Sequence, residues 1–178
     1  MNDRYEMRFA GSGGQGVILA SVIIAEAAVI KGLHTVQSQA YGPEARGGVS
    51  KAETVLSEKA IRYSKVTAPN FLLALTQASL NAYTKDLAEG AVVMIDDSLE
   101  APEGLEGVKV ISVPILSTAR EKVGKAFTAN IVAVGAINAA LGLFSDEEIM
   151  EAVKRHIPAG TEEINRKALE AGAELVKG

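Results

Sequence analysis

A glycine-rich turn between an alternating run and a long apolar segment lies close to the start of the chain. Residues 5–9 alternate apolar and polar, as strands do, and residues 17–30 are apolar with a single charge, which predicts a helix. Between them lies the turn, Gly11-Ser12-Gly13-Gly14-Gln15-Gly16. Its first, second and last glycines match G-x-G-x-x-G. A strand, a tight turn and a helix in this order predict an α/β fold.

The rest of the chain continues the alternation of strands and helices. Further strands are predicted at 34–39, 50–57, 71–75, 91–96 and 108–113, and further helices at 77–87, 117–125, 130–143, 146–155 and 161–176. Residues 60–64 are a candidate hairpin partner for 50–57. We find no repeat and no linker, so we expect a single three-layer α/β/α domain over 1–178. Its sheet is predicted to be mostly parallel and Rossmann-like, with an antiparallel hairpin component.

The glycine turn is a candidate anion-binding site. Glycine accepts positive φ and lets backbone N–H groups approach a ligand, and the helix that follows adds its N-terminal N–H groups and its dipole. The candidate cofactor-binding residues are Gly11, Gly13, Gly14, Gln15 and Gly16. A dinucleotide site would also need a carboxylate at the end of the second strand, and residues 36–38 hold none, which argues against NAD. The alternative is that these glycines serve only a tight turn and close packing.

A second unusual stretch, 41–48, follows the predicted second strand. Glu44 and Arg46 are two residues apart, so both would project from the same side of an extended segment. Arg46 can hold a phosphate or a carboxylate through two hydrogen bonds. The stretch is predicted to lie at the carboxyl edge of the sheet, where open α/β sheets bind ligands. We therefore expect a functional loop, with a solvated surface ion pair as the plainer alternative.

Composition argues against several classes of protein. The net charge of -4 without a basic run gives no electrostatic footprint for nucleic acid. The absence of cysteine rules out a disulfide, a thiolate nucleophile and an iron–sulfur cluster held by this chain, and two distant histidines make zinc improbable. No signal peptide and no apolar segment of about twenty residues is found, so we expect a cytoplasmic protein without a membrane partner.

Polar residues at the ends of predicted elements are expected to be structural. Asp96 and Asp97 close a strand and are interpreted as caps of the next turn, with a metal or acid–base site as the alternative. Asn130 is interpreted as a helix cap that could also face a partner. No Ser/His/acid or Cys/His arrangement is present, so no catalytic residue is assigned to this chain.

Four segments together resemble the gamma subunit of 2-oxoacid:ferredoxin (or 2-oxoacid:acceptor) oxidoreductases, the enzymes of pyruvate, 2-oxoglutarate and branched-chain 2-oxoacids. The segments are Gly11-Ser12-Gly13-Gly14-Gln15-Gly16-Val17, Tyr41-Gly42-Pro43-Glu44-Ala45-Arg46-Gly47-Gly48, Phe127-Thr128-Ala129-Asn130 and Asn165-Arg166-Lys167-Ala168-Leu169-Glu170-Ala171-Gly172. The resemblance extends over nearly the whole chain. The small subunit of indolepyruvate oxidoreductase is similar at the first motif and differs at the second.

The resemblance implies a multi-subunit complex. In this family thiamine diphosphate and magnesium lie between alpha and beta subunits, a delta subunit carries iron–sulfur clusters, and ferredoxin accepts the electrons. The gamma subunit would contribute to assembly and frame the coenzyme A and substrate region, with 2-oxoglutarate the favoured 2-oxoacid. The residues expected at this partner or active-site edge are Tyr41, Glu44, Arg46, Gly47 and Asn130. The chain alone should not catalyse the decarboxylation.

Two hypotheses from other classes stay open on the sequence. The chain could be a stand-alone nucleotide-binding module or small dehydrogenase that uses the glycine turn directly, although the missing second-strand carboxylate argues against it. It could also be a pure scaffold, in which both glycine motifs exist for packing against partners.

Overall fold

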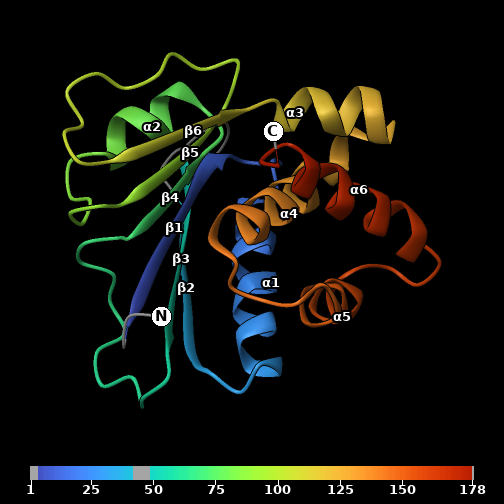
Figure 1. Ribbon diagram of the computed structural model, residues 1–178, viewed down its shortest axis with the longest axis horizontal. Coiled ribbons are helices and arrows are strands. Elements are labelled where there is room, and N and C mark those ends of the chain that lie inside the picture. Colours follow the sequence, from blue (N-terminus) through green and yellow to red (C-terminus); the bar gives the residue numbers. More distant parts are fainter. Residues whose placement is uncertain (1–3, 42–48, 178) are drawn as a thin grey trace.

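A single mixed sheet organises the computed structural model, which describes residues 4–41 and 49–177 (Figure 1). Its strands are β1 (Tyr5–Ser12), β2 (His34–Tyr41), β3 (Val49–Ser57), β4 (Phe71–Ala74), β5 (Val92–Asp96) and β6 (Lys109–Val113). The strand order is β2-β3-β1-β4-β5-β6. β1, β4, β5 and β6 run parallel, whereas β3 runs antiparallel to both of its neighbours. The expected parallel sheet with an antiparallel component is confirmed.

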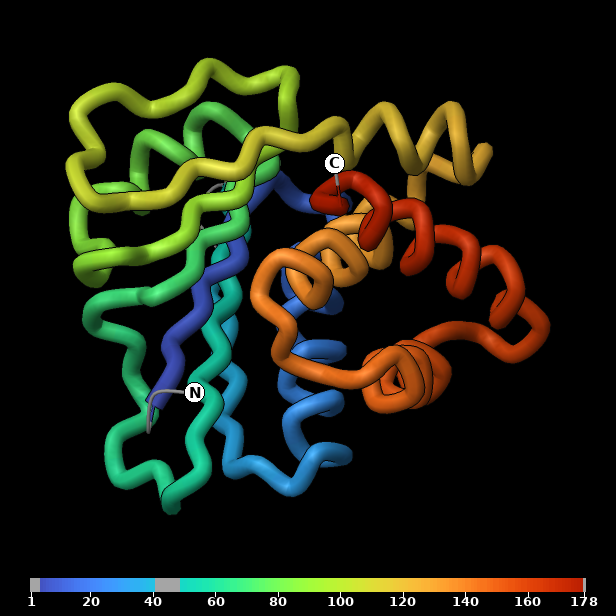
Figure 2. Tube along the Cα trace, viewed as in Figure 1, coloured from blue at the N-terminus to red at the C-terminus, as the bar shows by residue number. Residues whose placement is uncertain are grey.

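Helices cover the two faces of the sheet unequally. The helices are α1 (Val17–Ile30), α2 (Gln77–Tyr83), α3 (Ile115–Ser117), α4 (Ala129–Leu141), α5 (Asp146–His156) and α6 (Glu162–Glu174). A π-helical segment, Thr118–Val123, continues α3, and a 3-10 turn, Ala126–Thr128, precedes α4. α1 and α4 pack on one face with α5 and α6 outside them, and α2 lies on the other face (Figures 1 and 2). Among the described residues, no helix is both long and apolar enough to cross a lipid bilayer.

The antiparallel component differs from the predicted hairpin. We expected residues 50–57 to pair with 60–64, but β3 is hydrogen-bonded on one edge to β1 and on the other to β2, so no edge is left for a third strand. The segment after β3 is instead held by a nearly buried carboxylate. Glu6 Oε2 accepts hydrogen bonds from the backbone N–H groups of Thr67 (2.8 Å) and Ala68 (3.1 Å). Hydrogen bonds to a side chain, rather than pairing with another strand, therefore hold this segment in place.

The core lies mainly between the sheet and α1 and α4. Met7 and Phe9 of β1 are fully buried on this face, and Phe9 and Phe71 contact each other with ring centroids 6.2 Å apart. The opposite face carries a smaller apolar cluster and a buried cation. Arg8 is 4% exposed and binds Glu53 on β3 and Asp86, which lies after α2. This network links α2 to the sheet.

Two glycines set how closely α4 and α6 approach each other. A β-carbon built on Gly135 would lie 2.9 Å from the carbonyl carbon of Leu169 and 3.1 Å from the backbone nitrogen of Ala173. A β-carbon built on Gly172 would lie 2.8 Å from the carbonyl carbon of Val132. Real β-carbons essentially never approach other atoms within 3.0 Å. The helices therefore touch backbone to backbone, which only glycine permits at these positions.

Candidate anion-binding edge

The glycine turn lies at the carboxyl edge of the sheet, as expected. β1 ends at Ser12, and the parallel strand beside it, β4, ends at Ala74, so the turn and Leu75 are neighbours. Leu75 N donates to the carbonyl oxygen of Ala10 at 3.0 Å, which extends the strand pairing into the turn. Ligands of open α/β sheets bind at this edge.

The turn is held closed by the side chain of Gln15. Its Oε1 accepts a hydrogen bond from Ser12 N (2.8 Å), and its Nε2 donates to the carbonyl oxygen of Leu75 (3.2 Å). A β-carbon on Gly11 would lie 2.6 Å from Gln15 Oε1, so the first glycine makes room for this side chain. We predicted Gln15 as a ligand-binding residue. The structure places its side chain in internal hydrogen bonds, so only its backbone remains a candidate.

The last two glycines of the turn have left-handed backbone conformations. Gly14 has φ +89° and Gly16 has φ +73°, a region that L side chains rarely adopt. Gly13 and Gly14 are exposed, and no atom of the described residues lies within 4 Å of a β-carbon built on either. The positive φ expected of the turn glycines is thus present at Gly14 and Gly16.

The N-terminus of α1 has no side-chain cap. Gly16 occupies the N-cap position, and the N–H groups of Val17, Ile18 and Leu19 have no hydrogen-bond acceptor among the described residues. α2, whose N-terminus follows β4, is different, because Thr76 and Ser79 form a capping box. An uncapped helix start with open glycines before it suits an anion, through both its N–H groups and its dipole.

Asn130 lies against the glycine turn. A β-carbon on Gly16 would lie 2.8 Å from Asn130 Nδ2, so the two residues are in van der Waals contact across the start of α1 and α4. Asn130 is 6% exposed, and its Oδ1 accepts a hydrogen bond from Ile131 N (3.0 Å). We interpreted Asn130 as a helix cap. That was wrong, since Thr128 is the N-cap residue of α4 and its side chain makes no capping bond.

Of the second motif, residues 41–48, the structure shows only where the flanking strands end and begin. Glu44, Arg46 and Gly47 lie outside the described residues, and of Tyr41 only the backbone, at the end of β2, is described. In the strand register Tyr41 is opposite Ser50, and Val49 is opposite Ser12. The flanking residues Tyr41 and Val49 therefore lie at the same edge of the sheet as the glycine turn, which is where the sequence predicted this stretch to begin and end.

Asp96 caps the next turn, as predicted. It is 1% exposed, its Oδ1 accepts from Ser98 N (3.2 Å) and Ser98 Oγ, and its Oδ2 accepts from Leu116 N (2.8 Å). Every one of these contacts is internal. The carboxylate serves to fix the start of α3 beside the site.

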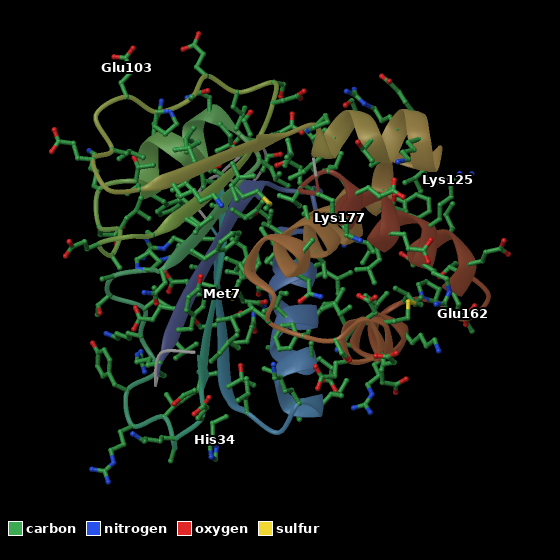
Figure 3. All side chains as sticks on the ribbon, viewed as in Figure 1. Met7, His34, Glu103, Lys125, Glu162 and Lys177 are labelled. Carbon is green, nitrogen blue, oxygen red and sulfur yellow. The ribbon has the colours of Figure 1, made fainter. Side chains whose placement is uncertain are left out.

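An exposed aromatic ring was named in the sequence only as part of the segment 127–130 and was given no role. Phe127 is 69% exposed in the 3-10 turn before α4, three residues before Asn130. The turn is rigid, because Thr128 Oγ1 donates to the carbonyl oxygen of Lys125 (2.7 Å) and Thr128 N bonds to the same oxygen (3.0 Å). Lys125 lies on the outside of the molecule, at the opposite end from His34 (Figure 3). The sequence pointed to Phe127 only through that segment, and the exposure of its ring is not a property that the segment reports.

The fold agrees with comparisons to known proteins. A family model described as pyruvate ferredoxin/flavodoxin oxidoreductase matches residues 6–175. The 2-oxoglutarate synthase subunit KorC of Methanothermobacter thermautotrophicus is 43% identical over 180 residues, covering 97% of this chain and 95% of the relative. The chain therefore belongs to the pyruvate ferredoxin/flavodoxin oxidoreductase family.

Solved structures narrow the assignment within the family. The keto/oxoacid ferredoxin oxidoreductase gamma subunit of Geobacter sulfurreducens matches with a TM-score of 0.87 and 44% identity, covering 97% of this chain and 95% of that one. The 2-oxoglutarate:ferredoxin oxidoreductase of Magnetococcus marinus, solved with 2-oxoglutarate, coenzyme A and succinyl-CoA, matches with a TM-score of 0.89. Its 22% identity, over 99% of this chain and 32% of that one, shows the fold alone. The chain is a gamma subunit of a 2-oxoacid:ferredoxin oxidoreductase, and not a stand-alone nucleotide-binding module.

Proposed function

We propose that this gamma subunit presents the glycine turn as a phosphate site for coenzyme A, at the edge where the other subunits dock. The observation that carries the proposal is the uncapped N-terminus of α1 behind the open glycines Gly13 and Gly14. Coenzyme A is polyanionic, and a helix N-terminus with unpaired N–H groups favours a phosphate by charge and by hydrogen bonding. The coenzyme A in the Magnetococcus marinus structure is consistent with this chemistry, although it does not place the molecule here.

The remaining cofactors of the reaction fit partner subunits better than this chain. Within 4–41 and 49–177, no group of three or more histidine and carboxylate side chains could hold a metal ion, and the sequence has no cysteine. A magnesium–diphosphate site needs such oxygen ligands, and an iron–sulfur cluster needs thiolates. In keeping with the family resemblance, we propose that alpha and beta subunits hold thiamine diphosphate with Mg and that a delta subunit or domain holds the clusters, with ferredoxin as the electron acceptor.

The substrate that we propose is 2-oxoglutarate, converted to an acyl-CoA by oxidative decarboxylation in a cytoplasmic complex. The name of the 43% identical relative supports this choice. A thiamine-dependent reaction takes its chemistry from the cofactor. The role of this chain would be to orient coenzyme A and close the active-site edge, with Glu44 and Arg46 of the second motif and Asn130 as neighbours of the turn.

The test compares an acidic and a neutral side chain at the glycine turn. Gly13 suits this test because its φ is not positive and a β-carbon there meets no atom of residues 4–41 and 49–177 within 4 Å, so both variants should fold. We expect Gly13→Asp to raise the apparent KM for coenzyme A about tenfold in the assembled complex, which corresponds to about 1.4 kcal/mol of repulsion. Gly13→Asn has the same shape without the charge and should stay near the wild type. Viologen reduction driven by 2-oxoglutarate gives both kinetic constants.

The same experiment separates the proposal from a scaffold role. Equal KM values for the aspartate and asparagine variants would rule out an anion at the turn. Loss of assembly in both variants, with normal kinetics in the complex that does form, would instead favour the scaffold.

A further inference from the structure

We propose that the segment 58–66 is a docking surface for an electron-accepting protein whose own surface carries a cluster of carboxylates. The segment follows β3 at the end of the sheet where β1 begins, opposite the glycine turn (Figures 1 and 2). The eight residues of β1 put this surface roughly 25 Å from the proposed coenzyme A site. The choice of the electron acceptor as the partner rests on the proposed function, in which ferredoxin takes up the electrons.

Positive charge is concentrated on this segment. Residues 58–66 hold Lys59, Arg62 and Lys65 and one carboxylate, Glu58, whereas the whole chain has a net charge of -4. Arg62 and Lys65 are exposed, and within 4–41 and 49–177 their side chains make no hydrogen bond or ion pair. A negatively charged chain that presents free cations in one place attracts a negatively charged partner to that place.

Arg4 holds the segment in one conformation. Its guanidinium donates to the carbonyl oxygens of Tyr63 (2.6 Å) and Lys65 (2.9 Å), and its Nε donates to Glu6 Oε1 (2.7 Å). Glu6 Oε2 in turn accepts from the backbone N–H groups of residues 67 and 68. The backbone beneath the exposed side chains is therefore fixed before a partner arrives, which lowers the entropy that binding costs.

A hollow of about 360 Å³ opens beside Tyr63, and its wall includes Arg4, Ile61 and Arg62. Tyr63 is 55% exposed, and the side chain of Arg4 is 31% exposed. A guanidinium has five N–H groups, and three of those of Arg4 are already used, so two remain for an acceptor that enters the hollow. Tyrosine and arginine around a recess are typical of the residues that dominate protein–protein binding. A carboxylate side chain of the partner fits this hollow by charge and by hydrogen bonding.

The composition of the surface favours a transient partner over a permanent one. The exposed residues of 58–66 are polar or charged, except Ala60 and Tyr63. Permanent subunit interfaces are large and apolar, whereas redox partners meet through small contacts that charge steers. Of the proteins that the reaction requires, the electron acceptor is the one that must bind and leave in every turnover. Charge and polarity together therefore select the acceptor over a further subunit.

The first test measures ferredoxin reduction by the assembled complex, with ferredoxin from the same organism as the probe. We expect Arg62→Glu with Lys65→Glu to raise the KM for ferredoxin about tenfold at low ionic strength and much less at high ionic strength, because salt screens the charges. The kcat with viologen and the KM for coenzyme A should not change. Arg166→Glu with Lys167→Glu is the matched control, since it changes the net charge equally on the exposed side of α6.

The outcomes separate this proposal from the others. Equal KM values for ferredoxin in the two double variants would overturn it. Failure of Arg62→Glu with Lys65→Glu to assemble, while the α6 control assembles, would overturn it as well and assign the segment to a contact between subunits. A wild-type complex that reduces viologen but not ferredoxin would contradict the proposed acceptor, and the coenzyme A site is tested by the KM for coenzyme A alone.

The second test asks whether Lys65 contacts the acceptor directly. A carbodiimide joins an amine to a carboxylate when the two are in contact, and mass spectrometry identifies the linked residues. We expect a cross-link from Lys65 to a carboxylate of ferredoxin. The link should disappear in Lys65→Arg, which keeps the charge without the amine and should keep the wild-type KM. A link from Lys65 to another subunit, or no link from it, would overturn the proposal.

Discussion

The backbone contact between α4 and α6 gives the sharpest stability prediction. Replacing Gly135 by alanine gains about 1 kcal/mol of helix propensity. Against this, the new methyl group would lie 2.9 Å from the carbonyl carbon of Leu169 and closer still to its oxygen. The neighbouring atoms are backbone, so no side chain can rotate away. The helices must therefore move apart. A gap of about 0.5–1 Å loses about a quarter to a half of the dispersion energy of each contact along the crossing.

Overpacking of this kind costs about 1–3 kcal/mol, and more where backbone must shift. We therefore expect Gly135→Ala to destabilise the chain by about 2 kcal/mol net of propensity, which lowers the melting temperature by about 4–8 °C. Thermal unfolding followed by circular dichroism measures it. Ala139→Gly, on the exposed side of α4, is the matched control for propensity and should cost about 1 kcal/mol.

The two glycines act on one crossing, so their substitutions should not be additive. Once Gly135→Ala has separated the helices, Gly172→Ala meets a wider gap and should add less than it costs alone. If Gly135→Ala raised the melting temperature, the reasoning would be refuted. The gain in helix propensity would then exceed the cost of the clash between the new methyl group and the backbone of α6. Full additivity in the double variant would show that the two contacts are separate.

Three further predictions follow from single contacts. Gly16→Ala places a side chain at a φ of +73° and against Asn130, so it should destabilise the fold by about 2 kcal/mol in denaturant unfolding. Adding Asn130→Ala removes the clash but not the backbone strain, so it should recover only part of this loss. Arg8→Ala removes the buried cation of the Glu53 and Asp86 pairs and leaves Glu53 with Lys51 alone, at 3.2 Å. It should cost about 3 kcal/mol, at the lower end of the range for a broken buried ion pair, measurable as a lower urea midpoint. The hydrogen bond from an α5 arginine lowers the pKa of Glu26, so this carboxylate stabilises the fold above its unfolded pKa and stops doing so as the pH falls through the lower folded value. Glu26→Gln should therefore lower the melting temperature by about 1–2 °C at pH 7 and by progressively less as the pH falls below the unfolded pKa of Glu26, whereas a pH-independent difference would contradict the assignment.

Local patterns in the sequence predicted most of the secondary structure, because each depends on neighbours in the chain. The strand expected from the alternation at 5–9, the strand at 71–75 and the start of the helix at 146–155 are all confirmed. Pairing was harder to predict. The alternation of 50–57 shows which residues share a face but not which strand lies beside them, and we gave β3 a hairpin partner that it does not have.

The site was predictable in place but not in its contacts. The order strand, turn, helix fixed the glycine turn at the carboxyl edge. The contact between Gly16 and Asn130 joins two helices far apart in the sequence, and no periodicity reports such a neighbour. Gln15 also differs from expectation, because whether a polar side chain turns outward to a ligand or inward to Ser12 N depends on the closed turn itself.

The central position of β1 has a consequence for synthesis on the ribosome. β1 is made before the other strands of the sheet, yet its parallel neighbour β4 ends only at Ala74. At about 5–20 residues per second, Met7 and Phe9 are made several seconds before this parallel strand is complete. α6 is made after α4, and its Gly172 must reach α4 before that crossing can close. The nascent chain therefore exposes the apolar face of its β1 strand early, which makes chaperone binding during translation a property expected of this topology.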